Sequence, residues 1–230
     1  MCFSWYVKHR EKSLEKRTPF PGSKMSQIPY SQEIKRKLVH LSSLWMAAAL
    51  LLLPRTFCAI LFGVMTVLTV LVEYAYYRKV PVVWQCYDFF FGRMLRDYGE
   101  GKFHLSGGAP VLAAACLSAL CFERPYSALA MAVMLLGDTA AALIGRRFGR
   151  HRFFNGKSLE GTLAFVLTGL AVVLIGFFAF DYPWQLLLGG ALGVGVAALL
   201  EFFNCELHLD DNLSIPLAVG AGFLLGTLLA

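Results

Sequence analysis

Acidic and basic side chains are concentrated in the stretch GDTAAALIGRRFGRHRFFNGKSLEGT, which runs from Gly137 to Thr162. It places Asp138 within an apolar run, then five Lys and Arg residues, then Glu160. Its Gly-Lys-Ser resembles the end of a phosphate-binding loop, but such a loop needs another glycine five residues before Gly156, where the chain has His151. Carboxylates suit a divalent cation, and Arg and Lys suit phosphate oxygens, so the stretch predicts a site for a metal-bound polyphosphate.

The composition indicates a membrane protein. Of the 230 residues, 57% are hydrophobic and only 16% are charged, whereas a soluble domain carries about 25% charged residues. Most of the apolar runs approach the ~20 residues that cross a bilayer core of about 30 Å as a helix. The connectors between these runs are too short for the polar faces of a soluble core. We therefore expect an integral, multi-pass membrane protein.

Seven apolar runs mark the expected transmembrane helices, and the first of them is short. They are Leu38–Leu53, Thr56–Tyr77, Leu105–Phe122, Tyr126–Gly145, Gly161–Phe180, Trp184–Phe203 and Leu213–Ala230. No linker divides them into two groups, so residues 32–230 are expected to form a single transmembrane catalytic domain after a polar N-terminal tail over residues 1–31. The predicted fold class is all-α, a polytopic membrane helical bundle of about seven transmembrane helices.

The basic residues predict the orientation of this bundle, because Lys and Arg in short loops favour the cytoplasmic side. Nine of the 21 precede the first run, five lie from Arg78 to Lys102, and five lie from Arg146 to Lys157. Only Arg55 and Arg124 remain for the other side. We therefore expect a cytoplasmic N-terminus, in a bacterial inner membrane or in an endoplasmic reticulum or plastid membrane. The asymmetry accounts for most of the net charge of +6, so no nucleic-acid partner is expected.

Under this orientation, the ionisable residues of the apolar runs fall in the cytoplasmic half of the membrane. Asp138 lies roughly two thirds of the way inward along its run, a depth at which a charge is costly and usually functional. A lipid whose polar head lies at the same depth is a substrate that such a site can reach. This favours phosphoryl or nucleotidyl transfer onto a lipid. The other residues expected at this face are His40, Glu73, His104, Arg146, Arg147, Arg150, Arg152, Lys157, Glu160, Glu201, Asp210 and Asp211.

Structural roles stay open for several of these residues. Asp138 could form an ion pair with a basic neighbour, the arginines could anchor a cytoplasmic loop, and Glu160 could cap the first turn of a helix. His40 could be an interfacial hydrogen-bonding group. Membrane helices with inward charges could also form a transporter or a channel, although here the charges lie on one side and the sequence shows no convincing internal repeat.

Three stretches resemble the polyprenol kinase family, which includes dolichol kinases, phytol kinases and CTP-dependent diacylglycerol kinases. The stretch from Gly137 to Thr162 resembles the central motif of that family. EIKRKLVHLSS, Glu33–Ser43, is similar to its Arg-Lys-x-x-His opening, and DDNLSIPL, Asp210–Leu217, is similar to its Asp-Asn-Leu-x-x-Pro-Leu. The resemblance covers residues 33 to 220. It implies an integral-membrane enzyme that uses CTP and a divalent metal, Mg2+, to phosphorylate a lipid alcohol.

Together with this resemblance, the residues suggest individual roles. Asp138 and Asp211 are the expected metal ligands, and the candidate catalytic residues are Asp138, Lys157, Glu160 and Glu201. The base that accepts the proton of the lipid hydroxyl stays open among Glu160, Glu201 and His40. The expected nucleotide-binding residues are Arg36, Lys37, His40, Arg146, Arg150, Gly156, Lys157, Ser158 and Asn212.

A second family leaves the reaction open. The phosphatidate cytidylyltransferases share the central motif more distantly, since their Asp-Thr-x-Ala and Lys-Lys-Thr-x-Glu-Gly resemble Asp138–Ala141 and Lys157–Gly161. The chain lacks their His-Gly-Gly followed by Asp-Arg-x-Asp, so cytidylyl transfer is the alternative reaction. Both reactions use CTP and magnesium. The lipid also stays open, because diacylglycerol, polyprenols and phytol all carry a hydroxyl on an apolar tail.

Overall fold

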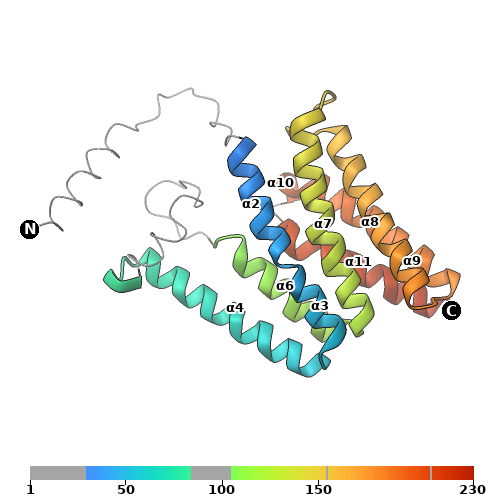
Figure 1. Cartoon of the computed structure of the whole chain (residues 1–230), viewed down its shortest axis with the longest axis horizontal. Coiled ribbons are helices and arrows are strands. Elements are labelled where there is room, and N and C mark those ends of the chain that lie inside the picture. The colour runs from blue at the N-terminus through green and yellow to red at the C-terminus, as the bar shows by residue number, and fades with distance from the viewer. Residues whose placement is uncertain (1–29, 84–104, 154, 208) are drawn as a thin grey trace, which may run out of the picture. The chain divides into compact units, whose positions relative to one another are not determined.

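The structure is a computed structural model, and it describes residues 30–83, 105–153, 155–207 and 209–230. Within these ranges the regular structure is helical, apart from an isolated antiparallel bridge between Arg152 and Ser158 (Figure 1). The predicted all-α class is therefore confirmed for this part of the chain. The helices are α2 (Tyr30–Ser42), α3 (Leu44–Leu52), α4 (Arg55–Tyr77), α6 (Gly108–Cys121), α7 (Arg124–Phe148), α8 (Leu159–Ala179), α9 (Trp184–Phe202), α10 (Asn204–Leu207) and α11 (Asp211–Leu228).

The polar tail predicted for residues 1–31 and the inward-facing His104 lie outside the described residues, except for the last two residues of the tail. Among the described residues, five helices are long and apolar enough to cross a membrane: α4, α7, α8, α9 and α11. Their bounds follow the apolar runs to within about three residues. The predicted multi-pass membrane bundle is thus confirmed, with five helices of spanning length where the sequence predicted about seven.

The two remaining apolar runs form shorter helices. The run predicted over Leu105–Phe122 forms α6, which has 14 residues. The run predicted over Leu38–Leu53 is divided between the end of α2 and the nine residues of α3. At the junction the Ser43 amide donates to the His40 carbonyl at 3.0 Å, three residues back, which is the tighter 3₁₀ pattern. This turn separates the charged helix α2 from the apolar helix α3.

α7 is the central helix of the bundle. It packs against α3, α6, α8 and α11, and it is the most extensively buried of the five long helices. Figure 1 shows α7 between α3 on one side and α8 on the other. Met131, Met134 and Leu135 on α7 are fully buried. Asp138 follows Leu135 by three residues, so the fold carries this carboxylate to the border of the apolar core.

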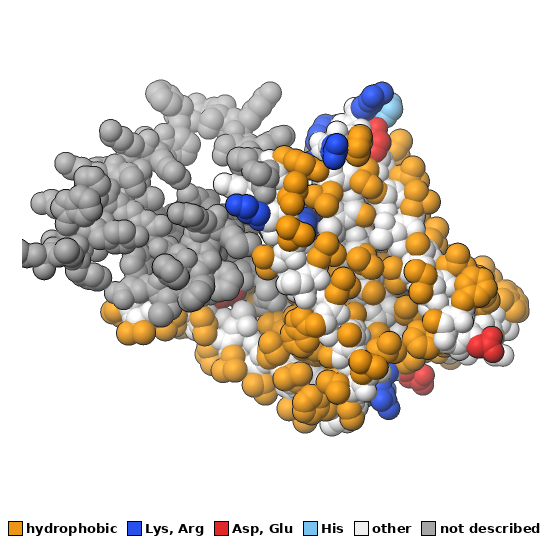
Figure 2. All heavy atoms as spheres, viewed as in Figure 1, with side chains coloured by type: hydrophobic (Ala, Val, Ile, Leu, Met, Phe, Trp, Pro, Cys, Tyr) orange, Lys and Arg blue, Asp and Glu red, His pale blue; other side chains and the backbone are white. Residues whose placement is uncertain are grey.

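The outward faces of the bundle are apolar. Ile60, Val67 and Leu71 on α4 are each more than half exposed. In Figure 2, hydrophobic side chains cover most of the visible surface of the described bundle, and charged side chains gather near its ends. A soluble protein rarely exposes an apolar surface of this extent, whereas a lipid bilayer requires it.

Glycines hold α9 and α11 close together. A Cβ atom built on Gly222 of α11 would lie 2.7 Å from the Cα atom of Gly193 on α9. Gly195, also on α9, has no neighbouring heavy atom within 4 Å of such a Cβ. Close backbone approach at small residues is a main source of helix association in lipid.

We expect Gly222→Ala to destabilise the protein, because its methyl group must push the two helix backbones apart. The loss in unfolding free energy should be about 1–3 kcal/mol, seen as a lower melting temperature of the detergent-purified protein. Gly195→Ala is the matched control and should leave the melting temperature unchanged or raise it slightly, since Ala favours a helix. Equal melting temperatures for the two variants would contradict this packing.

Candidate active site

Asp138 on α7 is the carboxylate around which the candidate site is arranged. Lys37 Nζ donates a hydrogen bond to Asp138 Oδ2, and His40 Nε2 lies 3.3 Å from the same oxygen. Lys37 and His40 are three residues apart on α2 and so share one helix face. The Lys37 side chain is only 6% exposed, which makes its ion pair a buried one. The stretch EIKRKLVH and the Gly-Asp-Thr stretch, distant in sequence, therefore meet in space.

Glu33 ties the start of α2 to the end of α7. Its side chain is only 1% exposed, and it accepts a hydrogen bond of 2.5 Å from Arg36 Nη2. Arg146 Nη2, from the last turn of α7, lies 3.4 Å from the other carboxylate oxygen. No role for Glu33 was predicted from the sequence. Its position four residues before Lys37, on the same face of α2, could have indicated that it lies in the same site.

The loop between α7 and α8 is docked on the end of α9. Asn155 Nδ2 donates to the Phe202 carbonyl at 2.7 Å, and Asn155 Oδ1 accepts from the Lys157 amide at 3.1 Å. The ring of Phe153 packs edge-on against Phe202, with centroids 4.8 Å apart. Gly156 has φ of +80°, a conformation that glycine adopts without strain. This role of Asn155 was not predicted from the sequence, because its partner lies 47 residues away.

Lys157 reaches the last turn of α9. Its Nζ lies 2.6 Å from Glu201 Oε1, and it also donates to the backbone carbonyl of Glu201. The Glu201 side chain is only 9% exposed. Lys157 and Glu201 therefore form a second buried ion pair between a carboxylate of a long helix and a lysine from outside that helix.

Ser158 and Glu160 serve as local structural groups at the start of α8. Ser158 is buried and caps α8, because its Oγ accepts a hydrogen bond from the Gly161 amide at 3.1 Å. Glu160 Oε1 lies 2.9 Å from His151 Nδ1 and accepts from the His151 amide at 3.2 Å. The structure therefore places Glu160 against the exposed His151 of the loop, and it leaves Arg150 exposed in the same loop.

Asp211 lies where α9, α10 and α11 meet. Asn204 Nδ2 donates to Asp211 Oδ2 at 2.5 Å. The Asp211 carboxylate is within electrostatic range of Lys157, Glu201 and Asp138. Asp211 is therefore coupled electrostatically both to the pair around Glu201 and to the pair around Asp138.

Asn212, which the sequence analysis expected to bind nucleotide, follows Asp211 at the start of α11. Its backbone amide and its Nδ2 donate to Asp210 Oδ1, at 2.9 and 3.0 Å. Asp210 is the N-cap residue of α11. Asn212 is thus bonded to this cap, not to the groups around Asp138.

At the junction of α9, α10 and α11, three oxygens lack a hydrogen-bond partner among the described residues: Glu201 Oε2, Asn204 Oδ1 and Asp211 Oδ1. All three are buried, and such oxygens are normally paired with a donor, a water molecule or a cation. Two carboxylates and an amide oxygen are the donors that Mg2+ uses in proteins. No cluster of three His, Cys, Asp or Glu side chains occurs in the part of the chain that the structure describes. The fit to Mg2+ therefore depends on the amide of Asn204.

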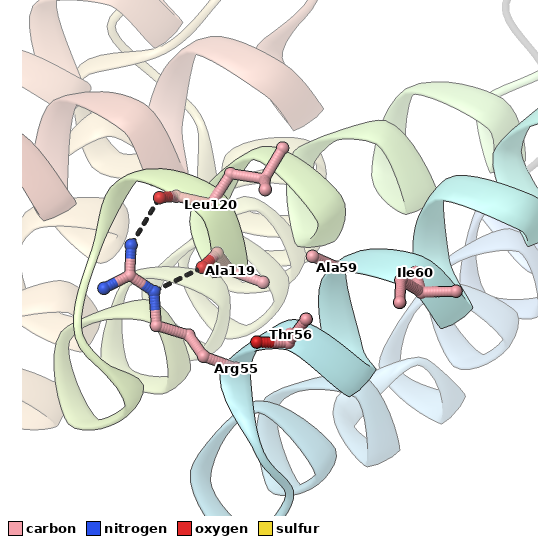
Figure 3. A pocket seen from close by; sticks show the side chains of 6 residues that line it. All are labelled: Arg55, Thr56, Ala59, Ile60, Ala119 and Leu120. Carbon is pink, nitrogen blue, oxygen red and sulfur yellow. Dashed lines mark hydrogen bonds between the residues drawn. The ribbon is translucent and has the colours of Figure 1, made fainter.

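A separate pocket of about 530 Å³ lies between α4 and α6 (Figure 3). Arg55 Nε donates to the Ala119 carbonyl at 2.8 Å, and Arg55 Nη2 donates to the Leu120 carbonyl. Arg55 thus caps the C-terminal end of α6. The remaining lining residues are Thr56, Ala59 and Ile60, so the pocket carries no carboxylate and shares no residue with the site around Asp138.

Comparison with known proteins supports a relation to phytol kinases. The chain is 36% identical to the phytol kinase of Synechocystis over 98 residues, which is 40% of each chain. It is 27% identical to the probable phytol kinase 3 of Glycine max over 205 residues, which is 82% of this chain and 61% of the relative. The match thus spans less than two thirds of the length of each of these kinases. It supports a phytol-kinase-like family.

A third relative is similar over nearly its whole length. An uncharacterised protein of Rickettsia prowazekii is 27% identical over 195 residues, which is 84% of this chain and 94% of the relative. No protein-family profile and no solved structure matches the chain.

We expect Lys37→Met to destabilise the protein by about 3 kcal/mol, because it leaves the Asp138 carboxylate without its buried partner. Adding Asp138→Asn in the same chain should recover part of this loss, since the uncompensated charge is then removed. Chemical or thermal unfolding of the four proteins of this double-mutant cycle measures the coupling. Lys35→Met is the control, because Lys35 is exposed on the same helix. Additive effects of the two substitutions would contradict a coupled pair.

Proposed function

We propose that the chain is a lipid kinase of the membrane that transfers the γ-phosphate of CTP to a lipid alcohol of the phytol, polyprenol or diacylglycerol class. The observation that carries this proposal is the meeting of Lys37 and His40 with Asp138, in electrostatic range of Asp211. Phosphoryl transfer depends mainly on positioning and on neutralising phosphate charge, so cations and metal-binding carboxylates at one place suit it. The similarity to phytol kinases supports the same reaction.

In the proposed reaction, the oxygen of the lipid hydroxyl attacks the γ-phosphorus. The bond between that phosphorus and the β,γ-bridging oxygen breaks, and the nucleoside diphosphate leaves. The hydroxyl proton passes to a base, for which His40, Glu201 and Glu160 are the candidates. His40 contacts Asp138 and Glu201 contacts Lys157, whereas Glu160 is held by His151 in the loop. This favours His40 or Glu201 over Glu160.

The triphosphate would be bound by cations from two segments, α2 and the loop that joins α7 to α8. Lys37 and Lys157 are each paired with a carboxylate, so nucleotide binding requires them to exchange that partner for phosphate oxygens. Mg2+, bound by Asp138 and Asp211, would neutralise charge on the phosphates. The other proposed nucleotide contacts are Arg36, His40, Arg146, Arg150, Gly156, Ser158 and Asn212.

The lipid would approach along the outer face of α2. Leu38 and Val39, which follow Lys37 directly, are 59% and 52% exposed. An apolar tail can pack on these side chains while its hydroxyl reaches the depth of Lys37 and Asp138. This surface sets no length for the tail, so it does not distinguish between the three classes of lipid alcohol.

We further propose seven membrane crossings with a cytoplasmic N-terminus. The five long helices supply five of them. α2 and α3 together extend from Tyr30 to Leu52, long enough for a sixth, and α6 with the residues around it supplies the seventh. The support for the orientation is the placement of 19 of the 21 Lys and Arg residues on one side.

This topology predicts that Arg152 and Asp181, which lie in the loops before and after α8, face opposite sides of the membrane. Both residues are exposed, so single cysteines there are accessible to a reagent. In a background without other cysteines, Arg152→Cys should react with an impermeant maleimide only from the cytoplasmic side, and Asp181→Cys only from the other side. The reverse pattern would overturn the orientation.

The reaction is tested by incubating the purified protein with Mg2+, lipid alcohols and CTP labelled at either the γ- or the α-phosphate. We expect label from the γ position in the lipid product, less product with ATP, and no product after chelation of the metal. Label from the α position would instead establish cytidylyl transfer.

Asp138→Asn should lower turnover by about 100-fold or more while the protein stays folded. Near-normal turnover of a folded Asp138→Asn protein would end the catalytic role of Asp138.

A further inference from the structure

The junction of α9, α10 and α11 gathers oxygen atoms that the protein itself leaves unsatisfied. Glu201 Oε2, Asn204 Oδ1 and Asp211 Oδ1 are all buried without a hydrogen-bond partner among the described residues. The Glu201 side chain is more than nine-tenths buried. Asn204 is in direct contact with Asp211, and it follows Glu201 by three residues, at the end of α9.

The other polar atom of each of these three side chains is already engaged within the protein. Glu201 Oε1 is paired with Lys157, and Asp211 Oδ2 accepts from Asn204 Nδ2. Each side chain thus uses one polar atom to fix its position and leaves one oxygen free. Two buried carboxylates close together repel each other, and Lys157 alone supplies one positive charge to this pair. A divalent cation would satisfy the three oxygens and balance the charge, and a Glu201 carboxylate engaged in this way would leave His40 as the candidate base.

We propose that Glu201, Asn204 and Asp211 form a divalent-cation site that binds its ion before the nucleotide arrives. Asp138 does not take part at this stage, because its single negative charge is already balanced by Lys37, whereas Glu201 and Asp211 have only Lys157 between them. Asp138 joins the metal only when the triphosphate draws Lys37 away. The order of these events rests on the proposed kinase function, whereas the cation site itself does not.

The site is tested by titrating the full chain, in a non-ionic detergent and without nucleotide, with Mn2+ followed by electron paramagnetic resonance. We expect one Mn2+ per chain, displaced by Mg2+. Loss of a group that only supports a ligand usually weakens metal binding about 10–100-fold, so Asp211→Asn and Asn204→Leu should each weaken Mn2+ binding at least about tenfold. Lys157→Met should tighten it, because a competing positive charge is removed.

Two variants serve as matched controls. Asp210→Asn removes the same charge from the neighbouring residue and keeps a good helix cap, and Asp138→Asn removes the carboxylate that pairs with Lys37. In the absence of nucleotide, Asp210→Asn should bind Mn2+ as the parent protein does, whereas Asp138→Asn should still bind one Mn2+ and lose less than the tenfold expected for a ligand. A melting curve of each variant with and without Mn2+ shows whether the variant is folded. Only proteins with an intact site should be stabilised by the ion.

Three outcomes would overturn the proposal. The parent protein could fail to bind Mn2+, in which case water satisfies the three oxygens. Asp210→Asn could weaken binding as much as Asp211→Asn, or Asp138→Asn could abolish it. A protein that binds Mn2+ as expected but labels no lipid from CTP would instead refute the kinase function alone, so the two failures are distinguishable.

Discussion

The buried ion pair between Lys37 and Asp138 is the interaction on which the arrangement of the site depends. A carboxylate at the border of the apolar core loses most of its hydration, and this cost is offset only where a counter-ion and hydrogen bonds are close. Lys37 supplies both, and His40 lies against the same oxygen. Because Lys37 is on α2 and Asp138 is on α7, the pair fixes the position of α2. The contact of Glu33 with Arg146 then orients the first turn of α2 against the last turn of α7.

A similar ion pair forms between Glu201 and Lys157. There the lysine comes from the loop after α7, and Asn155 holds that loop on the Phe202 carbonyl at the end of α9. In both cases a long apolar helix carries the carboxylate, and a polar segment outside it carries the lysine. The apolar helices can therefore pack as lipid requires, while the polar segments bring the charges to one end of the bundle. This division explains why the charged groups lie close together although most of the surface is apolar.

Much of this fold could be predicted from the sequence, because apolar length directly reflects the thickness of a bilayer. The runs predicted for α4, α8 and α9 agree with the observed helices to within about two residues. The run divided at Ser43 was not predicted, because a turn between a charged and an apolar helix leaves no break in the side-chain pattern. The sequence predicted only that EIKRKLVH and Asp138 lie at the same face of the membrane. Packing of α3 on α7 brings them into contact.

The residues that the sequence did not reveal are those whose partners are set by tertiary packing. Asn155 lies in the loop between α7 and α8, and its partner Phe202 is 47 residues away. Asn204 is only seven residues from its partner Asp211, but no motif marks it, and the contact depends on how α10 turns back toward α11.

Ser158 was predicted to bind nucleotide, but the packing around its hydroxyl could not be predicted from the sequence. A Cβ atom on Gly145 or Gly161 would lie 2.9 or 3.1 Å from Ser158 Oγ, so these glycines form the slot that encloses it. The hydroxyl already accepts from the Gly161 amide and faces the Gly145 carbonyl at 3.5 Å. Contact between Ser158 and a phosphate therefore requires the hydroxyl to leave its capping bond, whereas Lys157 has only to exchange one anionic partner for another. The Lys157 ammonium is the group in NGKS that can reach phosphate at the lower structural cost.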